Sequence, residues 1–488
     1  MDAVVVTGVL LLLAIMVTFA DWRRALFIAV PVALLQDPLR KLTPGEPVIY
    51  ILLVGLVLVT AAMTAAMSGV SFLPRQIWGW RRYLSLPFGF FVGIVILQSI
   101  NSLTRFGNVF VPLIGLIAYL TPFVALSLVY QTLLRSPENF LPNFLRFYVV
   151  CVSLWLTTIL LQFVGYDWAI LGEVGQGLTI FDRYSGAMLT AYSGLFRSSE
   201  VAAWHAGTCV CFFAILIVNR RMTVGKGLAA ASFLLIIIGL GMLTGRRKFL
   251  VEILIFGSAY GVFLLYFGRG ASRLAILSGL VGILGYFAFV LWLPDTQTEG
   301  AARVVRGGEQ YDEYVARTKT VIGWDIPERF VELGVAPITW AYNQYGLLGA
   351  GLGVGSQGAQ LFGATTQGAA EGGLGKIWLE LGAPGFVIVA WFGWALFRHI
   401  WYILNFVNAR SRELSRICSG LASFLVANVM TFAVATQVFS DIFVLALLGT
   451  ALAALCVMPI FAERALQRRV LNLTPNSTAL RRHQPAIG

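Results

Sequence analysis

The stretch IFVLALLGTALAALCVMPIF, residues 442–461, decides the fold class. It carries no charge and matches the roughly 20 apolar residues that a helix needs to cross a bilayer core of about 30 Å. Similar runs recur along almost the whole chain, because 58% of its 488 residues are hydrophobic and only 12% are charged. Strands would leave backbone groups unpaired in lipid, so these runs are predicted to be helices.

The sequence therefore predicts an all-α, polytopic membrane bundle of about thirteen helices, with a large outer loop between the tenth and the eleventh. Residues 1–293 form the N-terminal helices, 294–376 the loop with short amphipathic helices, 377–461 the C-terminal helices and 462–488 a basic, disordered tail. The expected spans are 3–20, 25–35, 48–70, 84–100, 109–130, 147–164, 201–218, 228–243, 249–267, 274–293, 377–397, 417–436 and 442–461.

The charge distribution predicts the orientation of the bundle. If the N-terminus lies outside, the inner side holds the connections 21–24, 74–83, 131–146, 219–227, 268–273 and 398–416 and the tail from 462. These segments carry most of the 35 Lys and Arg residues and few of the 23 Asp and Glu residues. Because basic residues accumulate on the cytoplasmic side, the C-terminus is predicted to be cytoplasmic.

The five cysteines all fall inside apolar runs, without a CxxC or Cys/His spacing. They are typical of small buried residues and indicate neither a metal site nor a redox motif. No metal or other cofactor is expected.

The cations Arg246, Arg247 and Lys248 lie at an outer helix end, where orientation alone does not explain them. Three successive cations repel one another unless an anion joins them, and a phosphate-bearing ligand fits this requirement. The alternative is an interfacial cluster that meets only lipid headgroups. Glu252, one turn into the following helix, is expected to pair with Lys248.

A second group of polar residues opens the seventh predicted helix. Ser198 or Ser199 is expected to cap this helix, with Glu200 in its first turn. Arg197 needs a compensating charge, because a cation near a helix N-terminus is unfavourable. His205, further along, is expected to be packed and hydrogen-bonded.

The outer loop 294–376 is too long for a simple connection, so a function is expected of it. Its glycine-rich runs, 349–355 and 368–375, allow tight turns or close approach to a ligand. With no suitable histidine on this side, a proton-transfer group has to be a carboxylate. The candidates are Asp312, Asp325, Glu328, Glu332, Glu371 and Glu380.

Three stretches, read in order, resemble the O-antigen ligase and O-antigen polymerase superfamily of bacterial membrane glycosyltransferases. They are GLFRSSEVAA at 194–203, LTGRRKFL at 243–250, and GLGVG at 351–355 followed by EGGLGKIWLELGAPG at 371–385. At the position where ligases carry histidine, this chain has Glu371. That difference favours a polymerase of exopolysaccharide, capsule or O-antigen repeats over a ligase.

The resemblance implies an inverting, metal-independent transfer at the periplasmic face of the inner membrane. Donor and acceptor would be polyprenyl-pyrophosphate-linked oligosaccharides, with the bilayer and other polysaccharide assembly proteins as partners and no nucleic acid. Arg247 and Glu371 would be catalytic, with Glu371 accepting the proton of the attacking hydroxyl. Substrate binding would fall to Arg197, Arg246, Lys248, Glu200 and Lys376.

Three alternatives stay open. Glu371 could instead cap the helix that begins near Gly375, or pair with Lys376. The whole protein could be a transporter or flippase of a lipid-linked saccharide or another anion. It could also be a noncatalytic scaffold of a polysaccharide complex.

Overall fold

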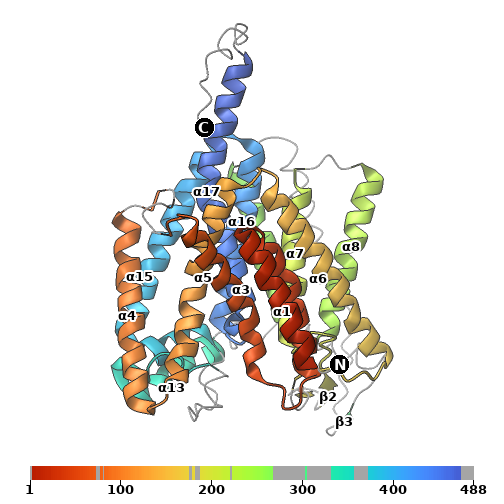
Figure 1. Ribbon diagram of the computed structural model, residues 1–488, viewed down its shortest axis with the longest axis vertical. Helices are drawn as coiled ribbons and strands as arrows, with labels where there is room; N and C mark the ends of the chain where they lie inside the picture. Colours follow the sequence, from red (N-terminus) through yellow and green to blue (C-terminus); the bar gives the residue numbers. More distant parts are fainter. Residues whose placement is uncertain are drawn as a thin grey trace.

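The computed structural model describes residues 3–72, 77, 79–80, 82–174, 179–181, 187–219, 223–267, 303–304, 331–356 and 372–473. Helices dominate these residues, and eleven of them are long and apolar enough to cross a membrane (Figure 1). The prediction of an all-α, polytopic membrane bundle is confirmed.

The described residues form the following helices, given in chain order. They are α1 (Ala3–Ala20), α2 (Ala25–Lys41), α3 (Leu53–Met67), α4 (Arg82–Phe106), α5 (Phe110–Arg135), α6 (Phe140–Val164), α7 (Ser199–Ile217), α8 (Val224–Leu243), α9 (Lys248–Phe267), α13 (Ala336–Tyr345), α15 (Gly373–Arg410), α16 (Arg412–Val434) and α17 (Ile442–Leu473). Short helical turns are η1 (Trp22–Arg24), η2 (Val48–Leu52), η5 (Val331–Val335), η6 (Gly346–Leu348) and η7 (Val438–Ser440).

Two of the thirteen predicted spans are not among these eleven. The helix expected at 25–35 is α2, which is longer than predicted but is not one of the eleven candidates. The helix expected at 274–293 lies outside the described residues, as do the amphipathic helices expected before residue 331. Within the described part of the outer loop, α13 is the helix that forms.

Several predicted boundaries are wrong, and the differences are largest at two of them. The connection expected at 398–416 is helical on both sides of Ser411, because α15 continues to Arg410 and α16 begins at Arg412. The tail expected to be disordered from residue 462 is helical as far as Leu473. Neither 398–416 nor 462–473 contains a proline or a glycine, the residues that most disfavour a helix. Each helix therefore continues into polar sequence beyond the end of its apolar run.

A small sheet interrupts the helical pattern between α6 and α7. Strand β2 (Ala187–Thr190) pairs antiparallel with β1 (Thr179–Phe181) and parallel with β3 (Arg303–Val304). It brings two residues of the long outer loop beside the connection that precedes α7, a juxtaposition that the sequence analysis did not predict.

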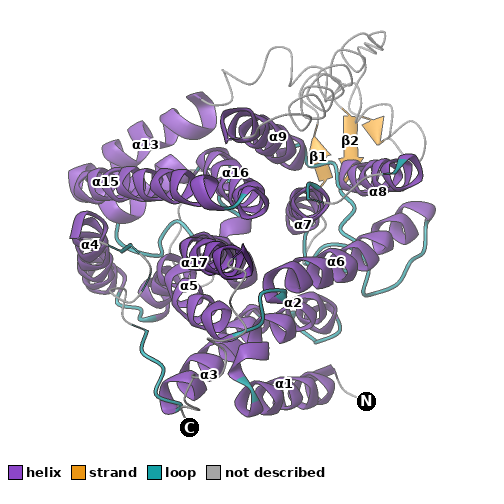
Figure 2. Cartoon of the chain, turned by 90° about the horizontal axis from the view of Figure 1, so that it is seen from above, coloured by secondary structure: helices purple, strands orange, loops and turns teal. Residues whose placement is uncertain are grey.

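Helix α17 is the centre of the bundle. In its membrane-spanning window 94% of residues are buried, against 17% in α1 at the periphery. It packs most extensively against α5, and the view from above shows both helices surrounded by the others (Figure 2). Their backbones touch at Gly449, where a Cβ atom would lie 2.3 Å from the carbonyl oxygen of Pro122. Small residues permit such close helix contacts in membranes.

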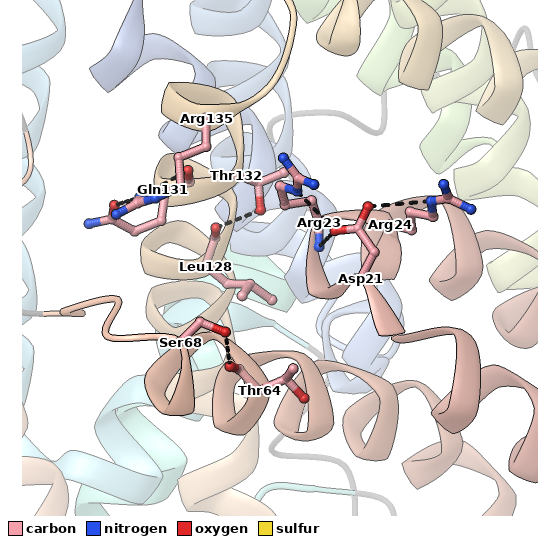
Figure 3. A network of polar contacts seen from close by, with 9 residues as sticks. All are labelled: Asp21, Arg23, Arg24, Thr64, Ser68, Leu128, Gln131, Thr132 and Arg135. Carbon is pink, nitrogen blue, oxygen red and sulfur yellow. Dashed lines mark hydrogen bonds and ion pairs between the residues drawn. The ribbon is translucent and has the colours of Figure 1, made fainter. Parts of the chain in front are cut away.

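Successive membrane-spanning helices run in opposite directions, so the connections between them lie at two opposite ends of the molecule (Figure 1). One end, called the basic end, holds the C-terminal end of α17 and η1. There Asp21 pairs with Arg23 at 2.9 Å and with Arg24 at 3.4 Å (Figure 3). The opposite end, called the site end, holds the N-terminal end of α1, α13 and the small sheet. This sorting agrees with the predicted alternation of the connections.

Candidate functional site

Charged side chains gather at the site end, where α7, α9 and α17 begin and α2 ends. They come from five parts of the chain and are called the polar cluster: Asp37, Lys41, Glu173, Arg197, Glu200, Arg246, Lys248 and Asp441. Helix N-termini carry partial positive charge, which favours carboxylates at this end of the bundle. The cations therefore need the carboxylates beside them.

Side chains hold most backbone N–H groups of the segment 193–199, which leads into α7. Gln162 Oε1 accepts from Ser193 (3.0 Å) and Gly194 (2.8 Å), Thr158 Oγ1 from Leu195 (3.0 Å), Asp37 Oδ2 from Arg197 (3.0 Å) and Glu173 Oε1 from Ser199 (2.7 Å). Because buried backbone groups require partners, this arrangement specifies one conformation of the segment.

Lys41, at the end of α2, donates hydrogen bonds to backbone carbonyl oxygens of the same segment. Its Nζ donates to the carbonyl oxygens of Ile170 at 3.1 Å, Gly194 at 2.9 Å and Phe196 at 2.7 Å. An ammonium group has three donors, and all three are used here. Lys41 therefore ties the connection before α7 to the end of α2.

Gly194 is required at the tightest point of this segment. Its φ is +56°, in the left-handed region that glycine adopts without penalty. A Cβ atom there would lie 2.4 Å from Thr158 Oγ1 and 2.8 Å from the backbone nitrogen of Ile159. The glycine thus lets the segment lie directly on α6.

Arg197 has the compensating charge that its position demands. Its Nη1 lies 2.6 Å from Asp441 Oδ2, and the two side chains are 11% and 3% exposed. Burial alone would lower the pKa of Arg197, but the carboxylates of Asp441 and Asp37 outweigh burial and hold that pKa above its ordinary value. The expected compensation is confirmed, and it comes from within the protein.

Asp441 has a second contact that fixes the start of α17. Its Oδ1 accepts a hydrogen bond from the backbone nitrogen of Phe443 at 2.7 Å, as an N-capping carboxylate does. One carboxylate therefore joins the start of the central helix to the segment that precedes α7.

Glu200 is the anion that joins the cations at the start of α9. Its Oε1 lies 3.2 Å from Arg246 Nη1 and 3.3 Å from Lys248 Nζ, and the Gln437 amide also donates to this carboxylate. The anion that these cations were predicted to need is therefore supplied by the protein itself. Because Glu200 faces both Arg246 and Lys248, this corner still carries one excess positive charge.

The start of α7 agrees with the sequence prediction. Ser198 Oγ accepts from the backbone nitrogen of Val201 at 3.4 Å, and Glu200 lies in the first turn. Ser199 is not the cap, because its Oγ accepts from Arg246 Nε at 3.0 Å. Arg247 is half-buried beside them, and its carbonyl accepts from the backbone nitrogen of Leu250 in the first turn of α9.

The expected pair between Glu252 and Lys248 is wrong, because Lys248 reaches across to Glu200 instead. Glu252 is fully buried and accepts from Thr208 Oγ1 at 3.3 Å. It lies against Gly207, where a Cβ atom would be 2.5 Å from its Oε2. The glycine on α7 thus creates the space that the carboxylate occupies.

His205 is packed and hydrogen-bonded, as predicted. It is 3% exposed, and its Nδ1 lies 2.7 Å from the hydroxyl of Tyr148 on α6.

The glycine-rich run 349–355 packs against other helices of the protein. Gly353 has φ +86°, and a Cβ there would lie 2.0 Å from the carbonyl oxygen of Val111 on α5. The N–H of Ala350 donates to Leu379 and that of Gly355 to Glu380 Oε1, at 2.7 and 2.9 Å. The glycines therefore let this run pack between α5 and α15.

The structure does not bring all predicted site residues together. Arg197, Glu200, Arg246 and Lys248 share the polar cluster, and Arg247 adjoins it in the chain. Lys376 lies apart from the cluster, buried in the first turn of α15. The predicted base Glu371 lies outside the described residues, as do the candidates Asp312, Asp325 and Glu328. Of the remaining two candidates, Glu332 is exposed and Glu380 is fully buried.

Four members of the cluster were not predicted from the sequence, namely Asp37, Lys41, Glu173 and Asp441. Two of them had a readable signal. Asp37 follows an otherwise apolar run, and Asp441 stands immediately before the uncharged run 442–461, the position of an N-cap.

The fold and the polar cluster together define a multi-pass α-helical membrane protein with a charged site at one end of its helices. No protein-family model matches the chain, and no curated protein matches it.

Proposed function

We propose that this protein is an inverting, metal-independent glycosyltransferase of the bacterial inner membrane. It polymerises polyprenyl-pyrophosphate-linked oligosaccharide repeats at the periplasmic face, where the site end and the N-terminus lie, with the C-terminus in the cytoplasm. The observation that carries the proposal is the corner formed by Arg246, Lys248 and Glu200. Two cations share one carboxylate there, at the N-termini of two helices.

This corner suits a pyrophosphate leaving group. As the bond between the sugar and the pyrophosphate breaks, negative charge grows on the departing phosphate oxygens. Preorganised cations stabilise that charge more in the transition state than in the ground state. The side chains of Arg246 and Lys248 remain 19% and 35% exposed, so an outside ligand has access to them.

The proposed reaction moves one glycosyl group. A hydroxyl of the acceptor sugar attacks the anomeric carbon of the donor, a new glycosidic bond forms, and polyprenyl pyrophosphate leaves. Glu371 accepts the hydroxyl proton, while Arg247 acts with Arg246 on the leaving group. The acidic side chain of Glu200 holds the cations in place.

Arg197 takes a different part from the one its sequence position suggested. Its side chain is 11% exposed, and its guanidinium group is paired with Asp441. We therefore assign it a positioning role, in which it fixes the start of α7 and with it Glu200.

Deletion of the gene tests the proposal. Cells should accumulate single lipid-linked repeat units on the outer leaflet and lack long polymer. Polymer of normal length that is never joined to its lipid core would identify a ligase instead. Normal polymer fully joined to its acceptor would refute the proposal.

A transporter or flippase of the same lipid-linked saccharide is the second candidate. Two observations favour it: Glu252 is fully buried within a membrane-spanning helix, and the backbone of α15 is broken at Gly382, with φ +68°. Repeat units trapped on the cytoplasmic leaflet of the deletion strain would identify this function.

A further inference from the structure

A cavity of about 230 Å³ lies between α5, α15, α16 and α17, apart from the polar cluster. Three of its lining residues are polar, Tyr119, Lys376 and Asn428. The others are Ala118, Pro122, Leu425, Val429, Phe432, Phe439, Leu445 and Leu448. The cavity therefore combines apolar walls with one cation.

The buried ammonium group of Lys376 indicates that the cavity binds an anionic ligand. This lysine is 4% exposed, and its ammonium group forms no hydrogen bond or ion pair within the described part of the chain. Glu380, one turn further along α15, interacts with it electrostatically but directs its Oε1 to the backbone nitrogen of Gly355, at 2.9 Å. A buried ammonium without hydrogen-bond acceptors is costly, and an anionic group in the cavity would supply them.

The apolar residues that line the cavity indicate what kind of molecule bears the anionic group. Leu425, Leu445 and Leu448 line the cavity along two helices, and Val429 on its edge is 65% exposed. Val429 belongs to a membrane-spanning helix, so this edge faces the region that lipid occupies. An apolar chain can enter from the bilayer with its charged head towards Lys376.

The size of the cavity limits how much of such a lipid it holds. Pockets that enclose a whole drug-sized ligand measure about 300–1,000 Å³. At about 230 Å³ this cavity takes the head and the first part of one chain, while the rest of the lipid remains in the bilayer.

Two contacts connect the walls of the cavity to the polar cluster. Asn428 lines the cavity, and its Oδ1 accepts from Trp204 Nε1 at 2.8 Å, on the same helix as Glu200. Phe439 of η7 also lines the cavity, while Gln437, two residues earlier, contacts Glu200. Two ligands could thus be bound side by side.

We propose that this cavity binds the phosphate-bearing end of a polyprenyl lipid, with Lys376 contacting the phosphate, and that it holds the second lipid-linked substrate. The identification of that lipid as the acceptor rests on the proposed function. The donor then occupies the corner formed by Arg246, Lys248 and Glu200.

The test is binding of a polyprenyl monophosphate that carries a photoreactive group, titrated into phosphatidylcholine nanodiscs containing the full-length protein. Because a charge-assisted hydrogen bond is lost, Lys376→Gln should weaken crosslinking about tenfold or more. Lys376→Arg should retain most of it. Lys226→Gln, the same change at an exposed position of α8 at the basic end, should leave binding unchanged.

A second variant avoids any effect of Lys376 on folding. Val429 is exposed, so Val429→Trp should fold normally while it narrows the edge of the cavity and reduces crosslinking. Binding that is equal in the parent, Lys376→Gln and Val429→Trp would overturn the proposal. Displacement of the probe by inorganic phosphate at equal concentration would show an anion site without a lipid requirement, and would also overturn it.

These outcomes are separate from the test of the proposed function. Crosslinking that depends on Lys376 supports the lipid site even if the deletion strain shows no defect in polymerisation. Accumulated lipid-linked repeats together with crosslinking that is independent of Lys376 would overturn this inference alone.

Discussion

Replacing Arg197 with methionine should strongly destabilise the protein, because it leaves the carboxylate of Asp441 buried without its cation. The two atoms that form the ion pair are 2.6 Å apart, and the side chains are 11% and 3% exposed, so solvent screens the pair little. Removing one partner of a buried pair costs about 3–5 kcal/mol. Methionine keeps most of the side-chain volume, so the loss reports mainly on the charge.

The matched control is the ion pair between Arg468 and Glu138 at the basic end. Its closest atoms are 2.9 Å apart, but the side chains are 66% and 50% exposed. An exposed pair contributes about 0–1 kcal/mol, so Arg468→Met should change stability within that range. The two substitutions are chemically the same and differ mainly in burial.

A second substitution separates the charge of Asp441 from its capping role. Asp441→Asn removes the charge but keeps an oxygen that can accept from Phe443, since asparagine is also a good N-cap. The double variant should therefore be less destabilised than the sum of the two single variants, by about 1–3 kcal/mol.

The measurement is the free energy of unfolding in mixed detergent micelles, obtained by denaturant titration of the four proteins and the control. The reasoning is refuted if Arg197→Met loses no more stability than Arg468→Met. Additive effects of Arg197→Met and Asp441→Asn would equally show that the two side chains do not act as a pair.

Four further predictions follow from the site and the topology. Gly194→Ala should destabilise the protein by more than about 1 kcal/mol, since its φ of +56° and the nearby Thr158 leave no room for a Cβ, and thermal unfolding measures this loss. Arg247→Lys should lower polymerisation about tenfold by losing the bidentate contact with phosphate, and a fully active Arg247→Ala protein at normal abundance would exclude that role. Glu371→Gln should reduce turnover by about a hundredfold or more while donor binding survives, and unchanged turnover in a reconstituted assay would end its assignment as the base. In cells with a permeable outer envelope, an impermeant thiol reagent should label Thr339→Cys at the site end and spare Arg412→Cys at the basic end, and the reverse pattern would invert the proposed orientation.

Local signals predicted the helices well. Apolar runs long enough to span a bilayer gave eleven of the expected spans, and the order Ser198, Ser199, Glu200 predicted the start of α7. Such signals lie within a few residues of the feature that they predict. They fail at boundaries such as Arg410, where a polar helix continues beyond the apolar run.

The partners in the polar cluster could not be predicted in the same way. Arg197 meets Asp37 and Asp441 only after the chain has folded, and residue spacing carries no signal for contacts between distant segments. The expected pair between Lys248 and Glu252 shows the same limit. Helical spacing favoured this neighbour on α9, but the carboxylate of Glu200 on α7 binds the lysine instead.

The central position of α17 constrains how the protein is made. This helix is synthesised last of those described, yet it fills the middle of the bundle and brings the carboxylate that Arg197 requires. The helices that precede it must therefore insert into the membrane before their shared interior exists. Until the ribosome has finished residues 441–461, that interior stays open and Arg197 lacks the Asp441 carboxylate. A ribosome that stops before this point leaves the bundle without its central helix and Arg197 without its carboxylate partner.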